Sequence, residues 1–249
     1  MKQPYVKGII HSNNQISTNI YELKIEIKGI ASNVYYGEPG QFYMIRGWGL
    51  DPFLSRPISI CDVSSDMITF LYEIRGKGTY IISKLKKGDT LELLGPLGNG
   101  FNMNLEGNIA IISGGIGIAP MIYLTKKLDA NIDFYCGFRN EVYYVEKIKN
   151  HVNNVFISTE DGSIGHKGFV TELFIPERYD LVLTCGPIPM MRRVVEICKE
   201  KVSVYISMES RMACGVGACL GCTIETISGM KRVCKEGPVF LGEEVVFHD

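Results

Sequence analysis

Four cysteines near the C-terminus limit how this chain can fold more than any other feature. The first three follow the spacing C-x4-C-x2-C, and the fourth comes after eleven further residues: Cys214, Cys219, Cys222 and Cys234. This spacing is typical of a plant-type [2Fe–2S] site, in which a tight loop supplies three thiolates and a later segment supplies the fourth. The glycines between the cysteines permit the backbone angles that such a loop requires: Gly215, Gly217 and Gly221. The sequence therefore predicts a one-electron carrier in this part of the chain.

A structural zinc site is the main alternative for these cysteines. Zinc ligands usually come as two C-x2-C pairs, whereas here the first gap is longer and the last cysteine stands alone, so the spacing favours iron–sulfur. Disulfides are disfavoured because Met1 to Gly8 has no signal-peptide pattern, and we expect a cytoplasmic protein with reduced thiols. The other cysteines are interpreted as small buried apolar residues: Cys61, Cys136, Cys185 and Cys198.

Length and charge narrow the class of protein further. The chain has 249 residues, enough for two ordinary domains. Its net charge of -1 gives no electrostatic reason to bind nucleic acid or an anionic membrane surface. No apolar run approaches the roughly 20 residues that a helix needs to span a bilayer. We therefore expect neither nucleic acid nor a membrane among its partners.

The first hundred residues contain short strands separated by turn signals. Residues 21–27 alternate apolar and polar side chains with period two, as a half-buried strand does. Many short strands with regular turns favour an antiparallel barrel, which we expect over residues 1–102. Its further elements are expected as strands at 41–45, 67–74 and 91–94, and one helix at 79–85.

The pattern changes near residue 108. Residues 109–113 form a short, wholly apolar run, which is typical of a strand buried on both faces of a parallel sheet. Strands and helices then alternate, which predicts a parallel sheet with crossover helices over residues 103–202. Residues 203–249 carry the four cysteines and are too short to hold a core alone, so cluster binding should supply much of their folding energy. The elements expected between 119 and 200 are strands at 132–136, 154–158 and 181–185, and helices at 119–128, 142–149 and 188–200.

Two motifs in the barrel region suit phosphate groups. Pro57 follows Arg56, whose planar guanidinium can bind a phosphate through two hydrogen bonds, and Ser59 stands two residues beyond the proline. An ordinary surface arginine is the alternative. Gly78 and Thr79 open the short helix, where backbone N–H groups face an anion.

The α/β region contains a glycine loop of the kind that binds a dinucleotide. Gly114, Gly115 and Gly117 come directly after the apolar strand and before a helix, which is the context that a phosphate loop requires. An ordinary strand–helix turn is the alternative, because Pro120 stands where the last glycine of G-x-G-x-x-G would be. A second loop ends a later strand of the same sheet, at the edge where open α/β sheets bind ligands: Cys185, Gly186 and Pro187.

Taken together, these motifs resemble those of the ferredoxin reductase superfamily over essentially the whole chain. The order is the same, with Arg-Pro-x-Ser, Gly-Gly-x-Gly-x-Ala-Pro and Cys-Gly-Pro before a [2Fe–2S] segment. Within that superfamily the chain resembles the electron transfer subunits of type B dihydroorotate dehydrogenases. The runs that carry this resemblance are 51–54, 56–60, 209–222 and 233–240. It implies an N-terminal antiparallel FAD-binding barrel, a central parallel-sheet NAD-binding domain and a C-terminal [2Fe–2S] segment.

The resemblance also implies roles for individual residues. Arg56 should bind the FAD pyrophosphate, Ser59 should lie near the isoalloxazine, and Ile58 replaces a tyrosine that stacks on the flavin in plant-type reductases. Ser55 stands where these subunits often carry a basic residue. The full set implied for FAD is Arg56, Pro57, Ile58, Ser59, Leu71, Tyr72, Glu73, Gly78 and Thr79. The set expected for the nicotinamide cofactor is Gly114, Gly115, Gly117, Cys185, Gly186 and Pro187.

The implied activity is electron transfer within an NAD-dependent dihydroorotate dehydrogenase of pyrimidine biosynthesis. Nothing in the sequence looks like a TIM barrel that could hold FMN, so an FMN-containing catalytic subunit is expected as partner, in a heterotetramer. No residue of this chain needs to act as a catalytic acid or base. NAD is expected over NADP, although Arg139 leaves NADP open.

Three alternatives remain for the function. Two come from relatives with the same layout: the flavin subunit of a sulfhydrogenase, and the small subunit of an electron-bifurcating NADH-dependent ferredoxin–NADP reductase. The latter has an aspartate where Cys214 stands, so Cys214 favours the dihydroorotate system. The third is a metal-stabilised binding module whose glycine loops are only turns.

Overall fold

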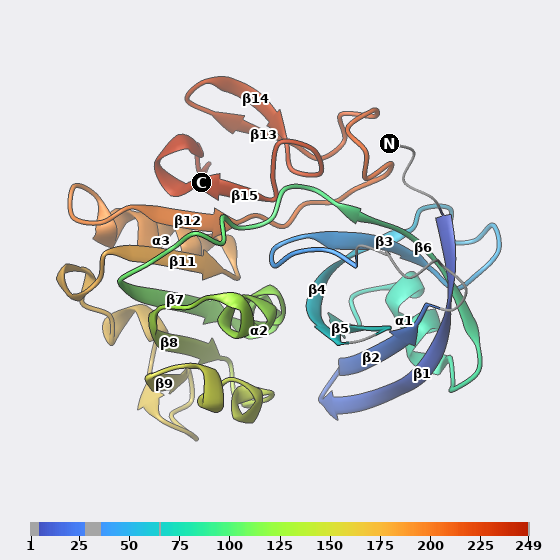
Figure 1. Ribbon diagram of the computed structural model, residues 1–249, viewed down its shortest axis with the longest axis horizontal. Coiled ribbons are helices and arrows are strands. Elements are labelled where there is room, and N and C mark those ends of the chain that lie inside the picture. The colour runs from blue at the N-terminus through green and yellow to red at the C-terminus, as the bar shows by residue number, and fades with distance from the viewer. Residues whose placement is uncertain (1–4, 28–35, 65, 249) are drawn as a thin grey trace.

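The computed structural model describes residues 5–27, 36–64 and 66–248 of the chain. A closed barrel and a seven-stranded sheet lie side by side, and the C-terminal segment extends over the upper edges of both (Figure 1). Within the described residues, no helix is long and apolar enough to cross a lipid bilayer.

The N-terminal barrel is closed and antiparallel, with strand order β1-β2-β5-β4-β3-β6, as the sequence predicts. The long strand β1 closes it, because its first half pairs with β6 and the rest with β2. Register shifts between Ile10 and Ser12 and between Gln15 and Ser17 interrupt the β1–β2 pairing, and such bulges bend a strand as barrel closure requires. The strands are β1 (Tyr5–Ser17), β2 (Ile20–Glu26), β3 (Phe42–Arg46), β4 (Arg56–Ser64), β5 (Met67–Glu73) and β6 (Thr90–Leu97).

The second sheet has the order β10-β9-β8-β7-β11-β12-β15 and is parallel except for β15, which confirms the predicted α/β architecture. The apolar run at its centre is β7, whose residues are buried after the first. Parallel strands covered on both faces must be apolar throughout, which explains that run. The strands are β7 (Asn108–Gly114), β8 (Asn131–Phe138), β9 (Asn154–Thr159), β10 (His166–Lys167), β11 (Leu181–Cys185), β12 (Val204–Ser207) and β15 (Val239–Leu241).

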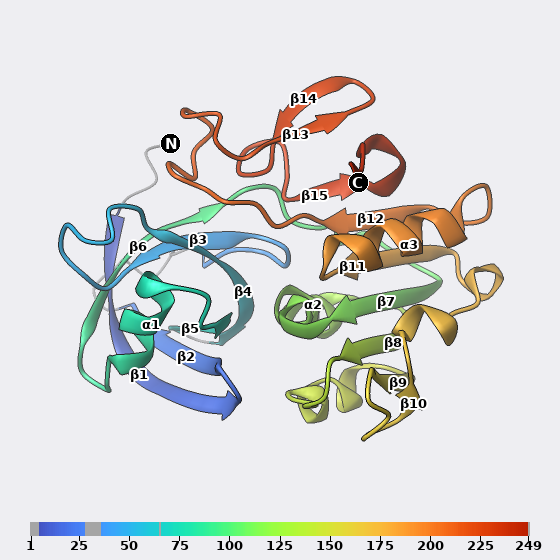
Figure 2. The same ribbon diagram turned by 180° about the vertical axis from the view of Figure 1, so that it is seen from behind.

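Two helices cover opposite faces of this sheet (Figures 1 and 2). Helix α2 (Ile118–Lys127) packs with Ile109 and Ile111 of β7 and lies between the sheet and barrel strand β4. Helix α3 (Ile188–Cys198) packs with the alternate β7 residues, Ala110 and Ile112. The third helix, α1 (Lys77–Lys84), belongs to the barrel.

The prediction of a helix over residues 142–149 is wrong. The structure has two short 3-10 turns there, Val145–Lys147 and Lys149–His151. Tyr144 adopts a left-handed backbone with φ of 66°, which an α-helix cannot contain. Its hydroxyl donates a hydrogen bond to Glu22 on β2 of the barrel, so a contact between the two domains accompanies the break.

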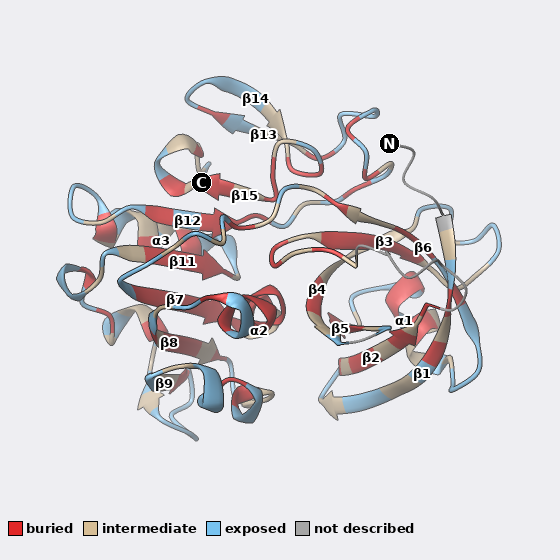
Figure 3. Cartoon of the chain, viewed as in Figure 1, coloured by how far each residue is buried: buried red, intermediate tan, exposed pale blue. Residues whose placement is uncertain are grey.

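The C-terminal residues are shared between the sheet and a separate hairpin. Strands β12 and β15 extend the parallel sheet, while β13 (Thr223–Thr226) and β14 (Gly229–Arg232) form a separate antiparallel pair, and Thr226 makes an isolated bridge to Val245. The segment contains buried residues, as the barrel and the sheet do (Figure 3). Side chains from all three regions form one apolar cluster. That cluster includes Met44 and Leu97 from the barrel and Met212, Val233 and Phe240 from the segment.

Candidate functional site

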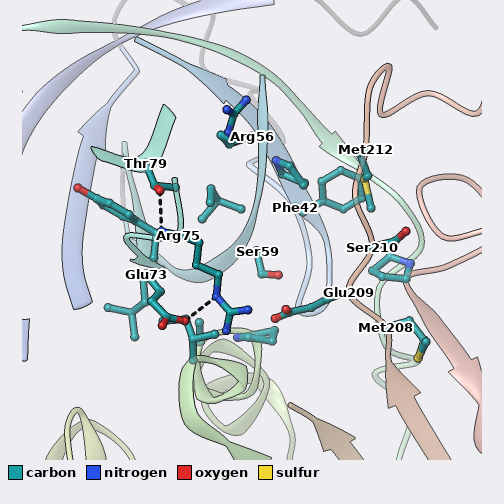
Figure 4. Close-up of a pocket in the computed structure, with 18 residues that line it drawn as sticks. Phe42, Arg56, Ser59, Glu73, Arg75, Thr79, Met208, Glu209, Ser210 and Met212 are labelled. Carbon is teal, nitrogen blue, oxygen red and sulfur yellow. Dashed lines mark hydrogen bonds and ion pairs between the residues drawn. The ribbon is translucent and has the colours of Figure 1, made fainter. Parts of the chain in front are cut away.

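A groove opens between the barrel and the C-terminal segment (Figure 4). Strands β4 and β5 form its barrel side, and residues of the C-terminal segment face them: Met208, Glu209, Ser210 and Met212. Eight of the nine positions expected to hold FAD line this groove: Arg56, Pro57, Ile58, Ser59, Leu71, Tyr72, Glu73 and Thr79. Two strands and one helix start thus bring together residues that the sequence separates by more than twenty positions.

The ninth position, Gly78, lies directly against Arg56. A Cβ added at Gly78 would lie 2.6 Å from Arg56 Nε and 2.8 Å from the ring of Trp48. The guanidinium sits over the Trp48 ring, 5.3 Å from its centroid, and donates a hydrogen bond to the Leu54 carbonyl. Glycine is therefore required at position 78 for Arg56 to keep this place.

The start of helix α1 is closed by a threonine hydroxyl. Thr79 Oγ1 accepts hydrogen bonds from the backbone N–H groups of Arg75, at 3.0 Å, and Gly76, at 3.3 Å, and donates to the Gly76 carbonyl. Thr79 lines the groove and Gly78 lies against Arg56, so the first turn of α1, with its partial positive charge, lies at the groove and favours an anionic group there.

The isoleucine at position 58 leaves the covering of a flavin ring to other side chains. Two aromatic residues line the groove, Phe42 and Tyr72. Phe42 on β3 lies opposite Ser59 in the strand register. Tyr72 is buried, stacks on Tyr21 with ring centroids 5.5 Å apart, and donates a hydrogen bond to Asn13. Burial raises the pKa of Tyr72, so it stays a neutral phenol.

A second cleft, with a volume of about 1060 Å³, adjoins the groove. Five of the six positions expected for the nicotinamide cofactor line it: Gly114, Gly115, Gly117, Gly186 and Pro187. The sixth, Cys185, is buried behind the loop, and a Cβ added at Gly117 would lie 2.3 Å from its carbonyl oxygen. This close approach of two backbones at the carboxyl ends of β7 and β11 explains the glycine at 117.

The groove and the cleft share a wall. Four residues line both: Glu73, Arg75, Ile116 and Glu209. Arg75 Nε donates to Glu73 at 2.7 Å, and the Glu209 carboxylate points toward the same guanidinium (Figure 4). Glu209 is exposed to the solvent of the cleft, but the protein around it partly desolvates its carboxylate and raises its pKa. We did not predict Arg75 or Glu209 as site residues, although Glu209 begins the run that contains the first three cysteines.

The four C-terminal cysteines lie together as two pairs. The N–H of Cys219 donates to Cys214 Sγ at 3.4 Å, and the N–H of Cys234 donates to Cys222 Sγ at 3.4 Å. Across residues 5–27, 36–64 and 66–248, no three His, Cys, Asp or Glu side chains converge as ligands of one metal ion. Two pairs fit a two-iron cluster, in which each iron takes two thiolates, better than a single zinc ion.

Backbone N–H groups point at these sulfurs. Gly217 N–H donates to Cys234 Sγ at 3.1 Å, and Ala218 N–H donates to Cys214 Sγ at 3.3 Å. Partial burial alone would raise the pKa of Cys214, but the N–H donors around it lower the pKa to about 6. Burial and the neighbouring Cys222 instead raise the pKa of Cys234 to about 12. Ligation would have to displace that proton, because metal ions bind thiolates.

The backbone angles of the loop differ from the prediction at one position. Gly215 and Gly217 have positive φ, of 71° and 81°, as expected. Gly221 does not, and the neighbouring Leu220 takes the left-handed conformation instead, with φ of 60°. A leucine rarely adopts this angle, so the loop holds it there against local preference. The remaining four cysteines are buried and unpaired, which confirms their interpretation as apolar core residues.

Known proteins identify the family. Residues 209–246 match the family model described as the iron–sulfur cluster binding domain of dihydroorotate dehydrogenase B. The chain is 52% identical, over its full length and that of its relative, to the dihydroorotate dehydrogenase B (NAD(+)) electron transfer subunit of Clostridium acetobutylicum. It is 49% identical over 99% of its length to the subunit of the same name from Clostridium perfringens. The chain belongs to the family of dihydroorotate dehydrogenase B electron transfer subunits.

A solved structure extends this likeness to three dimensions. The structure of an NADH-dependent reduced ferredoxin–NADP oxidoreductase, described for flavin-based electron bifurcation, superposes with a TM-score of 0.86. It is 27% identical and covers 99% of this chain and 91% of its own. The dihydroorotate dehydrogenase B family and this bifurcating enzyme therefore share one architecture, and the much higher sequence identity assigns the chain to the former.

Proposed function

We propose that this chain is the electron transfer subunit of an NAD-dependent dihydroorotate dehydrogenase B, acting in pyrimidine biosynthesis. It holds FAD in the groove, NAD(H) in the adjoining cleft and a [2Fe–2S] cluster on the four cysteines. An FMN-containing catalytic subunit supplies the electrons, in a heterotetramer located in the cytoplasm. When bound, the flavin accepts single electrons by way of the cluster and exchanges a hydride with the nicotinamide.

One observation carries this proposal: a single short segment links all three sites. Glu209 stands in the wall between the groove and the cleft, Met212 lines the groove, and Cys214 begins the cluster loop. Met212 is also buried in the apolar cluster that contains Cys222 and Cys234. A group in the groove would therefore have the nicotinamide cleft on one side and the cysteines on the other, as an electron relay requires.

The side chains of this chain bind, orient and exclude water. Arg56 and the start of α1 would hold the FAD pyrophosphate, with Ser59 near the ring and Phe42 opposite it. The glycine loop would bring the helix start of α2 to the NAD pyrophosphate. We propose the domain bounds 1–102, 103–202 and 203–249 for these three functions, with β12 and β15 of the last range completing the sheet of the second.

We also propose that NAD is preferred over NADP. Arg139 lines the nicotinamide cleft, but the carboxylates of Glu141 and Glu160 line the same cleft beside it. Their negative charge disfavours an additional phosphate on the ribose.

The experiment is to purify the chain anaerobically, alone and with its FMN-containing partner. The chain alone should be yellow-brown, with flavin bands and broad iron–sulfur absorption, and the pair should oxidise dihydroorotate with NAD+ and much more slowly with NADP+. A colourless protein with one zinc ion would contradict the cofactor assignment. Loaded protein without dihydroorotate–NAD activity in the pair would contradict the partner, and equal rates with both nucleotides would contradict the NAD preference.

A further inference from the structure

The side chain of Arg232, at the end of β14, connects the two parts of the chain that carry the cysteines. Its Nη1 donates to the Gly217 carbonyl at 2.8 Å, and Gly217 lies in the first loop, between Cys214 and Cys219. Its Nε donates to Glu236 Oε2 at 2.9 Å, and Nη2 donates to the other oxygen of the same carboxylate. All three guanidinium nitrogens therefore donate hydrogen bonds, to three oxygens on two residues.

The segment of the fourth cysteine thus holds Gly217 at both of its backbone groups, the N–H and the carbonyl. Its carbonyl accepts from Arg232, while its N–H donates to Cys234 Sγ at 3.1 Å. Glu236 also accepts from the backbone N–H of Arg232, at 2.8 Å, so the carboxylate fixes both the side chain and the main chain of that residue. The Arg232 and Glu236 side chains are 26% and 32% exposed, so the protein shields the arrangement in part.

We propose that Arg232 is a positioning residue for the [2Fe–2S] cluster: it holds the Gly217 N–H on the sulfur of Cys234 and thereby tunes the cluster's reduction potential and its retention. This inference rests on the proposed function, since it concerns a cluster bound by the four cysteines. Reduction adds negative charge to the cluster, and an N–H bond to a ligand sulfur stabilises that charge. Residues that orient ligands are often as important to a metal site as the ligands themselves.

Charge and position can be separated by substitution. Lys keeps the positive charge of Arg232 but lacks the planar fork that reaches Glu236 and Gly217 together. Arg232→Lys therefore removes the hydrogen bonds that position Gly217 and keeps the positive charge, whereas Arg232→Gln removes both the hydrogen bonds and the charge. Lys231 provides the matched control, because it is the adjacent residue, its side chain is 28% exposed, and it pairs with Glu244 at 2.9 Å, away from the cysteine loops.

The experiment measures the cluster in the FAD-loaded chain, with three readouts. These are the midpoint potential by redox titration, the EPR spectrum of the reduced cluster, and the rate of iron release to a chelator. Arg232→Lys and Arg232→Gln should both lower the potential, alter the EPR spectrum and release iron about tenfold faster, as loss of a ligand-orienting contact does. Lys231→Gln should match the wild type in the spectrum and in iron release.

Two results would overturn the inference. If Arg232→Lys equals the wild type in all three readouts while Arg232→Gln does not, Arg232 acts through its charge alone. If both variants equal the wild type, it has no role at the cluster. A variant that assembles no cluster while keeping FAD supports the inference only if Lys231→Gln assembles one. A wild-type chain without a two-iron spectrum would instead refute the proposed function.

Discussion

The flavin groove and the cluster loop lie in one molecule but are built by different means. The groove residues expected to bind FAD stand on β4, β5 and α1, whose backbones are hydrogen-bonded in regular structure over the barrel core. The loop that carries Cys214, Cys219 and Cys222 belongs to no helix or strand, and N–H bonds to sulfur are prominent among its contacts. The groove can therefore form before its ligand binds, whereas the loop depends on ligation for much of its order.

The largest expected effect is the loss of order in the cluster loop when a buried cysteine ligand of the cluster is replaced. Cys222→Ser should prevent stable cluster binding, and hydrogen exchange should then become fast between residues 213 and 236. Exchange in the barrel strands should stay slow and FAD should remain bound, because the barrel has its own core. Cys198→Ser, at a buried cysteine of α3, is the control and should keep the cluster. Fast exchange that spreads through the barrel would show that the two regions fold as one unit.

A substitution in the groove should have the opposite outcome: it should weaken FAD binding and leave the cluster in place. In Gly78→Ala the new methyl group would displace the Arg56 guanidinium from its place over Trp48. Loss of one charge-assisted contact costs about 1.5–3 kcal/mol, so FAD should bind roughly 10- to 100-fold more weakly by fluorescence titration. Gly76→Ala is the matched control, since nothing lies within 4 Å of its added Cβ. Equal FAD affinity in both variants would show that Arg56 does not hold the cofactor.

The smallest effect concerns the contact between the barrel and the α/β domain. Glu141 accepts hydrogen bonds from Ser17 Oγ, from Thr18 Oγ1 at 2.6 Å and from Thr18 N–H at 2.9 Å, which lower its pKa from 4.5 to about 2. A lowered carboxyl pKa means that its stabilisation is present above pH 4.5 and is lost as the pH falls toward 2.

Glu141→Gln should therefore lower the Tm at pH 7 by at most about 3 °C, and the difference from the wild type should shrink as the pH falls below 4.5. Thermal unfolding followed by circular dichroism across this range checks it. Glu106→Gln, at an exposed position between the domains, should leave the Tm unchanged at every pH. A constant difference between Glu141→Gln and the wild type down to pH 3 would show that the carboxylate charge is not what stabilises the contact.

Much of the architecture could be predicted from local patterns. The period-two run at 21–27 corresponds to β2, and the apolar run at 109–113 corresponds to β7, because burial on one or two faces dictates which side chains a strand carries. The prediction of a helix over 142–149 was wrong because of a tertiary contact. Tyr144 adopts a left-handed backbone conformation where its side chain contacts Glu22 of the barrel. Arg75 and Glu209 were not predicted for a similar reason: they meet only where two domains adjoin.

The order of the three regions could be read from the sequence, which also predicts four cysteines as the ligands of the cluster. Cysteine spacing and glycine placement are properties of a short stretch of chain, and hydrophobic periodicity reports burial residue by residue. Three features could not be read from the sequence: the arrangement of the cysteines as two pairs, the place of Glu209 between groove and cleft, and the contact of Arg232 with Gly217. Such contacts depend on how segments that are far apart in the sequence pack against one another, and no local sequence pattern encodes that packing.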